Sequence, residues 1–200
     1  MVQSVREETR VETYHSAPKL TYADYLQFPP DNLRHEVIGG EHFVTPSPVT
    51  RHQRISRDLL FLLLQHLKEH PLGEVFVAPF DVLLSDSDIV VPDLLYVSHE
   101  RARLVTSKNL QGPPDLVVEI LSPGTRNRDL HLKRDLYERV GVTEYWLVDL
   151  DRDVVMVLRR RGEGRFDSPD ERSRASHDVL DTPLLPGLAI AVDRLLASGT

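Results

Sequence analysis

The 200-residue sequence contains no cysteine, a single tryptophan and no long apolar run. The lack of cysteine excludes disulfides and thiolate metal sites, and it is compatible with a reducing cytoplasm, where we expect the protein. The longest apolar cluster, residues 59–64, is too short to span a membrane. Residues 1–16 are polar and lack the apolar core of a secretion signal. We therefore expect no membrane association and no export.

Positive charge is also scarce, because 24 Lys and Arg face 31 Asp and Glu, which gives a formal net charge of −7. Non-specific affinity for nucleic acid depends on Lys and Arg that neutralise phosphates. The composition therefore excludes a bulk polyanion binder, and any contact with nucleic acid requires a local basic patch. The length and the apolar fraction of 40% indicate a globular chain with one substantial core.

Hydrophobic periodicity and chain breakers predict a flexible arm over residues 1–19 and a single domain over residues 20–200. Helices are predicted after Thr21 and at 50–70 and 129–140, strands at 74–85, 89–98, 115–121, 144–150 and 153–160, an irregular loop at 161–178, and a C-terminal extended segment with a short helix. The Gly39-Gly40 pair predicts an N-terminal hairpin that places Glu36 opposite Phe43. The order helix, strand, strand, strand, helix, strand predicts an α/β fold with a mixed central sheet flanked by helices.

Three charged residues lie where the pattern predicts core. Lys133 falls near the middle of an apolar arc on the predicted helix, Glu119 lies on an apolar strand face, and Asp93 follows Pro92 within another apolar strand. The arc comprises Leu130, Leu132, Leu136, Tyr137 and Val140. Pro92 cannot donate to a sheet ladder and predicts interrupted pairing beside Asp93. An unpaired buried charge is too costly to keep, so the three groups are expected to meet.

Two carboxylates that meet a lysine form either a structural ion network or a divalent-metal site with a cation beside it. Carboxylate oxygens are hard ligands that suit Mg²⁺ or Mn²⁺, which typically take one or two carboxylates plus water and phosphate oxygens. The pattern alone leaves both interpretations open. In the structural interpretation, Asp93 caps a strand bulge, and Glu119 and Lys133 neutralise each other.

Three stretches of the sequence carry a resemblance to a known family. They are "HEVIGGEHFV", "VVPDLLYVS" and "PDLVVEILSPGTRNRDLHLKRDLYERVGVTEYWLVD". They resemble the bacterial putative restriction endonuclease family, also called the Uma-two family, of the PD-(D/E)XK nuclease superfamily. The likeness extends from about Thr21 to the end of the chain. It implies a restriction endonuclease-like core of αβββαβ order with an N-terminal helix and a β-hairpin extension, in agreement with the elements predicted above.

The resemblance also implies a site. Asp93 and Glu119 match the metal-binding carboxylates of the superfamily, and Ile120 would lend its backbone carbonyl to the metal, Mg²⁺ or Mn²⁺. The sequence departs from the superfamily pattern at Leu121, where a lysine is usual, and Lys133 is the matching position on the following helix. A lysine displaced in this way must still reach a metal-bound water.

Two further residues, Glu36 and His52, match family positions near this site and are candidate auxiliary ligands or bases. For Glu36 a plain hairpin residue, and for His52 a satisfied core or capping histidine, remain open alternatives. A competing motif, "HLKEH" at residues 66–70, has the spacing of inverted zinc peptidases. Pro71 biases His70 away from helical geometry and disfavours that interpretation.

The first functional hypothesis is a Mg²⁺- or Mn²⁺-dependent endonuclease, most simply one that cleaves DNA as a homodimer. Its local basic rim would comprise Arg51, Arg54, Arg57, Arg126, Arg128 and Arg134. The alternative is a catalytically inactive nuclease-fold protein that binds DNA or a protein partner, which the missing lysine at Leu121 favours. Hydrolysis of another phosphate ester is a third hypothesis, because a metal site does not identify what carries the phosphate.

Overall fold

A six-stranded mixed sheet forms the centre of the molecule in the computed structural model, which describes residues 18–31, 33–162 and 164–197. Its strands, in the order β11-β10-β9-β8-β6-β3, are β3 (Gly73–Val77), β6 (Leu94–Ser98), β8 (Leu116–Ile120), β9 (Glu144–Asp149), β10 (Val154–Arg159) and β11 (Asp170–Ser173). Strands β8 and β9 are parallel, and the other neighbours are antiparallel. The predicted mixed sheet is confirmed, whereas the arm predicted over residues 1–19 lies almost entirely outside the described residues.

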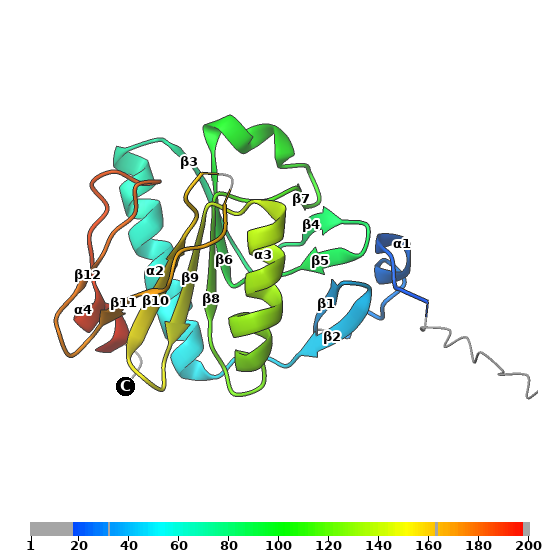
Figure 1. Ribbon diagram of the computed structural model, residues 1–200, viewed down its shortest axis with the longest axis horizontal. Helices are drawn as coiled ribbons and strands as arrows, with labels where there is room; N and C mark the ends of the chain where they lie inside the picture. Colours follow the sequence, from blue (N-terminus) through cyan, green and yellow to red (C-terminus); the bar gives the residue numbers. More distant parts are fainter. Residues whose placement is uncertain (1–17, 32, 163, 198–200) are drawn as a thin grey trace, which may run out of the picture.

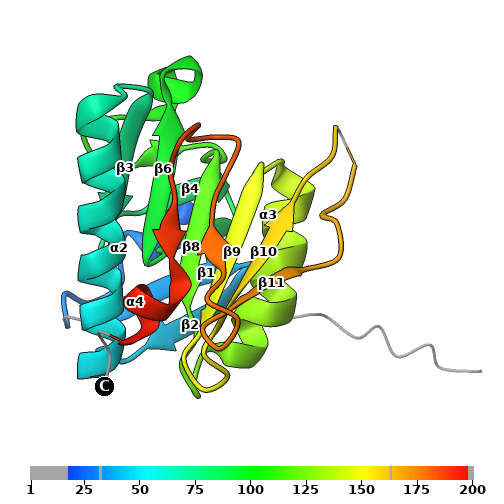
Figure 2. The same cartoon turned by 90° about the vertical axis from the view of Figure 1, so that its left-hand side faces the viewer.

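Two helices cover one face of this sheet, and a third lies against the opposite face (Figure 2). Helix α2 (Thr50–Glu69) packs Ile55, Leu59 and Leu63 against β6, β8 and β9, together with the C-terminal helix α4 (Val192–Ala197). No helix among the described residues is long and apolar enough to cross a membrane. Since β8 is covered on both faces, each of its five residues is buried, as expected for such a strand.

The opposite face is covered by the helix that follows β8 and by a second, five-stranded sheet (Figure 1). The second sheet has the order β2-β1-β5-β4-β7, with β1 (Arg34–Ile38), β2 (Glu41–Thr45), β4 (Val82–Ser85), β5 (Asp88–Val90) and β7 (Leu110–Gln111). The predicted hairpin is β1 and β2, with Glu36 paired opposite Phe43. The functional residues lie where the two sheets meet.

Short elements complete the fold. They are the helix α1 (Tyr22–Tyr25), the 3-10 helix η1 (His99–Leu104) and the strands β12 (Val179–Leu180) and β13 (Ile190–Ala191). Helix α1 begins as predicted: the Thr21 side chain accepts from Asp24 N, and the Asp24 carboxylate accepts from Thr21 N.

Two predicted strands prove to be divided between the sheets. The strand predicted at 74–85 begins as β3 in the six-stranded sheet and, after Pro79, continues as β4 in the other sheet. The strand predicted at 89–98 is likewise divided into β5 and β6. Proline has no N–H to donate to a sheet ladder. Each of the two segments therefore leaves its sheet near a proline, Pro79 in the first and Pro92 in the second. The interruption predicted beside Asp93 is therefore present, but the prediction of two continuous strands was wrong.

Two further expectations need correction. The loop predicted at 161–178 contains β11, whose polar sequence carries no hydrophobic alternation because it is a partly exposed edge strand. The predicted helix at 129–140 begins with a π-helical segment, η2 (Arg128–Lys133), before α3 (Arg134–Val140). The wider π turn rotates Leu132 out of the predicted apolar arc and leaves it 39% exposed.

Candidate active site

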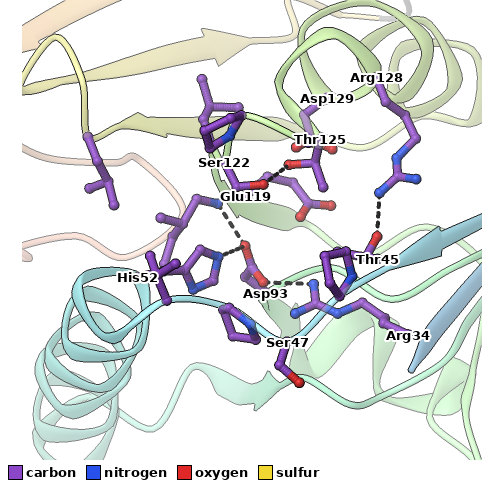
Figure 3. A pocket seen from close by; sticks show the side chains of 18 of the residues that line it. Arg34, Thr45, Ser47, His52, Asp93, Glu119, Ser122, Thr125, Arg128 and Asp129 are labelled. Atoms are coloured by element: carbon purple, nitrogen blue, oxygen red, sulfur yellow. Dashed lines mark hydrogen bonds and ion pairs between the residues drawn. The ribbon is translucent and has the colours of Figure 1, made fainter. Parts of the chain in front are cut away.

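Asp93 lies in the short link between β5 and β6, where the chain crosses from one sheet to the other. Its Oδ1 accepts from Arg34 Nη1 at 2.8 Å, and its Oδ2 accepts from Ile120 N at 2.8 Å. His52 Nε2 lies 3.1 Å from the same Oδ2 (Figure 3). Burial opposes ionisation of Asp93, but the bond from His52 and the charge of Arg34 lower its pKa to about 2. Asp93 is therefore a fixed carboxylate anion.

Glu119 and Lys133 meet in the layer between β8 and the following helix. Lys133 Nζ donates to Glu119 Oε1 at 2.8 Å, and Tyr137 Oη donates to the same oxygen at 3.0 Å. Asp93, Glu119 and Lys133 are only 3%, 2% and 1% exposed. The three predicted charges thus lie in one buried region, and the Tyr137 hydroxyl binds the glutamate that holds Lys133.

Glu36, on β1, closes the region from the side of the second sheet. Its Oε1 accepts from Val91 N at 2.9 Å and lies 2.7 Å from Lys133 Nζ. Its Oε2 lies 3.3 Å from Arg128 Nη2. The carboxylate is completely buried and does not line the pocket described below. The structure therefore places Glu36 behind the lysine, where it holds Lys133 rather than facing a substrate.

The sequence prediction missed Arg34, Arg128 and Asp129 as members of this cluster. Asp129 Oδ1 lies 3.6 Å from Lys133 Nζ, is buried, and has no hydrogen-bond partner. The signals were present: Asp129 is four residues before Lys133 on a helix, and Arg34 shares a strand face with Glu36. Arg128 Nη2 donates to Thr45 at 2.5 Å and ties the helix to β2.

The cluster contains one more acidic group than it has permanent cations. The carboxylates are Glu36, Asp93, Glu119 and Asp129, and the cations are Arg34, Arg128 and Lys133. Burial raises the pKa of Glu119 to about 8; Lys133 opposes this shift, and the other three carboxylates add to it. Burial also favours the neutral form of Lys133, but its carboxylate neighbours raise its pKa above the ordinary value. Lys133 therefore stays charged, while burial and the excess of carboxylates favour the neutral form of Glu119.

A pocket of about 410 Å³ opens onto this cluster. Its polar lining comprises Arg34, Thr45, Ser47, Arg51, His52, Asp93, Glu119, Ser122, Thr125, Arg128, Asp129, Lys133 and Asp151. Figure 3 shows Asp93 and Glu119 at its centre, with Ser47 on one side and Ser122 and Thr125 on the other. The turn after β8 and the segment after β2 thus form opposite walls, and Ile120, whose N–H donates to Asp93, also lines the pocket.

The donor set suits a hard divalent cation, although it is not a complete cage. Across 18–31, 33–162 and 164–197, no three His, Asp or Glu side chains converge as a metal-binding group. Mg²⁺, however, is usually bound by one or two carboxylates together with water and substrate oxygens. Ionised carboxylates have about four acceptor positions. Asp93 uses three of them, and both known donors to Glu119 are on Oε1, so lone pairs remain on each side chain.

The zinc motif at residues 66–70 has no such support. The rings of His66 and His70 lie 4.6 Å apart at the end of α2, and in the part of the chain that the structure describes no third ligand joins them. Helix α2 ends at Glu69, as Pro71 led us to expect.

Comparison with known proteins identifies the family of the chain. A family model described as "Putative restriction endonuclease", Uma2, matches residues 22–193. The chain belongs to the Uma2 family. The resemblance stated from the sequence is thereby confirmed over most of the chain. No curated protein matches the sequence.

Among solved structures, this member of the Uma2 family is similar to a putative nuclease of the DUF820 family from Anabaena variabilis. The two share 19% sequence identity and a TM-score of 0.77, and the match covers 90% of this chain and 99% of the other. At this identity the likeness shows the fold alone. It confirms the predicted α/β architecture.

Proposed function

We propose that this Uma2 protein is a Mg²⁺- or Mn²⁺-dependent nuclease that hydrolyses phosphodiester bonds, with DNA as the substrate. The observation that carries the proposal is the convergence of Asp93 and Glu119 on one pocket with Lys133 bound to Glu119. Family membership and the fold of the Anabaena protein support it. Paired carboxylates beside a permanent cation suit phosphoryl chemistry, in which charge stabilisation dominates.

Each residue has a role that its contacts suggest. Asp93 and Glu119 would hold the metal with the Ile120 carbonyl, and the metal when bound supplies Lewis acidity and a more acidic water. Lys133 remains charged, so it stabilises developing negative charge and does not act as a general base. His52 fixes the Asp93 carboxylate, and Glu36 positions Lys133 from behind the pocket.

Metal binding and cleavage test the proposal together. Wild type, Asp93→Asn and Glu119→Gln are titrated with Mg²⁺ and Mn²⁺ by calorimetry and then incubated with supercoiled plasmid and single-stranded DNA. Glu144→Gln, which alters a buried carboxylate outside the pocket, is the matched control. We expect binding and cleavage in wild type and control, and neither in the two pocket variants. Cleavage that persists in folded Asp93→Asn refutes the assignment.

The alternative function is a catalytically inactive nuclease fold that binds DNA or a protein. Two observations favour it: Leu121 occupies the usual lysine position, and both oxygens of Asp93 already bind Arg34, His52 or Ile120 N. In that case calorimetry detects no divalent binding that depends on Asp93 and Glu119, while both variants remain folded. Wild type then cleaves no DNA under any metal condition.

The homodimer stays a prediction. It is expected because cleavage of both strands of a duplex favours a two-fold arrangement. Sedimentation equilibrium of the full chain tests it directly. A monomer at the concentrations that support cleavage refutes it without affecting the assignment of Asp93 and Glu119.

A further inference from the structure

The reactive carboxylates lie at the bottom of a pocket and not along an open groove. Asp93, Glu119 and Lys133 are almost completely buried, and the pocket volume of about 410 Å³ falls in the range of small-molecule sites. Walls from the segment after β2 and the turn after β8 flank the carboxylates on both sides (Figure 3). A phosphodiester must enter between these walls to reach them. A phosphate in a rigid duplex carries its complementary strand with it and meets the walls first.

A second cavity adjoins the pocket, and residues around Asp93 line both. The second cavity has a volume of about 340 Å³ and shares Arg34, His52 and Asp93 with the first. Residues 45–48 also line both cavities, and the second cavity is lined as well by the link between β3 and β4. Much of the lining of the two cavities is aliphatic or proline: Pro46, Pro48, Val49, Leu121, Pro123, Leu150, Leu33, Val77, Ala78 and Pro79. Such walls suit the sugar and base of nucleotides on either side of a phosphate at the carboxylates.

The arginines around the pocket offer little free positive charge for a second strand. Arg51 binds Asp153 at 2.6 Å, and Arg126 binds both oxygens of Asp149 at 2.9 and 2.6 Å. Duplex DNA carries one negative charge per about 1.7 Å of helix axis, and its binders neutralise many phosphates with cations. Arginines paired with carboxylates add little net charge, and the whole chain carries −7. Two members of the predicted basic rim, Arg51 and Arg126, are therefore neutralised by neighbouring carboxylates.

We propose that the substrate of this site is an unpaired nucleic-acid strand that enters the pocket, and not an intact duplex. The inference rests on the proposed nuclease function and adds to it the state of the substrate. The depth of Asp93 and Glu119, the walls on both sides of them and the paired arginines each favour one strand over two. An unpaired strand can turn its backbone inward and needs only a few phosphate contacts.

The first test uses three DNA substrates of one sequence, each with the same fluorescent label: a single strand, a fully paired duplex, and a duplex with a central unpaired bubble. Wild type is assayed with Mn²⁺, with Glu119→Gln as the negative control and Glu144→Gln as the positive one. We expect the single strand and the bubble to be cleaved at least about tenfold faster than the duplex. Cuts in the bubble substrate should map to the unpaired region.

The second test measures how kcat/KM for the single strand depends on monovalent salt at fixed Mn²⁺. Contact with one or two phosphates predicts a slope of about −0.7 to −1.4 in a log–log plot. A slope several times steeper means that many phosphates are neutralised, and it overturns the inference.

The outcomes separate the inference from the function on which it rests. Cleavage of the duplex as fast as the single strand, with loss in Glu119→Gln, overturns the inference and leaves the nuclease assignment intact. A chromogenic phosphodiester, bis(p-nitrophenyl) phosphate, serves as an independent readout. Its metal-dependent hydrolysis without cleavage of any DNA overturns the nucleic-acid substrate, and no hydrolysis of any substrate overturns the nuclease function itself.

Discussion

Two buried glutamates on neighbouring strands, Glu119 and Glu144, have the same exposure of 2% but different surroundings. Glu144, at the start of β9, accepts from Trp146 Nε1 at 2.5 Å, Thr182 Oγ1 at 2.9 Å and Arg159 Nε at 3.2 Å. These donors are distributed over both oxygens, and Glu144 does not line the pocket. Both donors to Glu119 bind one oxygen.

The difference shows that burial alone does not mark a functional carboxylate. Glu144 pairs with Leu116 at the far end of the parallel ladder, whereas Glu119 pairs with Leu147 near the end that opens into the pocket. Burial raises the pKa of both glutamates; at Glu119 three other carboxylates add to the rise against Lys133, whereas at Glu144 only hydrogen bonds and Arg159 act, and they oppose it. Unbalanced charge beside a cavity, and not depth, distinguishes the candidate active site.

The largest effect is expected from removal of the cation on the Glu119 side. Lys133→Met leaves its carboxylate neighbours uncompensated and should lower the free energy of unfolding by about 3–5 kcal/mol at neutral pH. Arg159→Met, which removes a partly exposed cation from Glu144, should cost about 1–2 kcal/mol. Urea denaturation measures both values. The loss in Lys133→Met should shrink near pH 4, where carboxyls take up protons, and a pH-independent loss contradicts this explanation.

Exchange of each glutamate for glutamine should separate activity from stability. Glu119→Gln should lower the cleavage rate about a thousandfold, because a metal ligand supplying several kcal/mol is removed. Its stability should change by less than about 1 kcal/mol, since glutamine mimics the protonated carboxyl favoured there. Glu144→Gln should lose about 1–3 kcal/mol of stability and keep its activity. Equal effects of the two substitutions on activity contradict the comparison.

Protonation of Glu119 should appear in the pH dependence of metal binding. Its pKa is about 8, above the ordinary value of 4.5. The stability it contributes without metal is therefore present below about pH 4.5 and lost as the pH rises through about 8. At pH 7, Mg²⁺ must displace this proton, so calorimetry in buffers of different ionisation enthalpy should show release of about one proton. Glu144→Gln should release the same proton on binding Mg²⁺. If the wild type releases no proton, Glu119 is already ionised at pH 7.

The smallest effects are expected from loss of one neutral hydrogen-bond donor beside each of the two glutamates, Glu119 and Glu144. Tyr137→Phe removes the hydroxyl from Glu119 Oε1, and Thr182→Val removes one from Glu144. Each should cost about 1 kcal/mol of stability. Only Tyr137→Phe should also change the rate of cleavage, by up to about tenfold. An effect of Thr182→Val on the rate would mean that the Glu144 region communicates with the pocket.

That Asp93, Glu119 and Lys133 gather at one pocket was predictable, because each charge interrupts an apolar pattern that local sequence reveals. The position of Glu36 opposite Phe43 followed from the Gly39-Gly40 turn. Such signals depend only on near neighbours in the chain.

Features that depend on tertiary structure were not predictable in this way. Arg34 reaches Asp93 only because two sheets meet, across a sequence separation of 59 residues. A regular helical period does not foresee the π turn that exposes Leu132. Edge strand β11 carries no apolar signal, because little of it is buried.

The pairing of Arg51 and Arg126 with neighbouring carboxylates has a consequence for how the protein finds its target. Proteins that slide along DNA are held to it by mobile electrostatic contacts with many phosphates. With these arginines paired with Asp153 and Asp149, the nuclease proposed above would gain little from a one-dimensional search. It would meet its substrate by three-dimensional collision, so the local concentration of accessible strand ends, gaps or loops would set its rate of action in the cell.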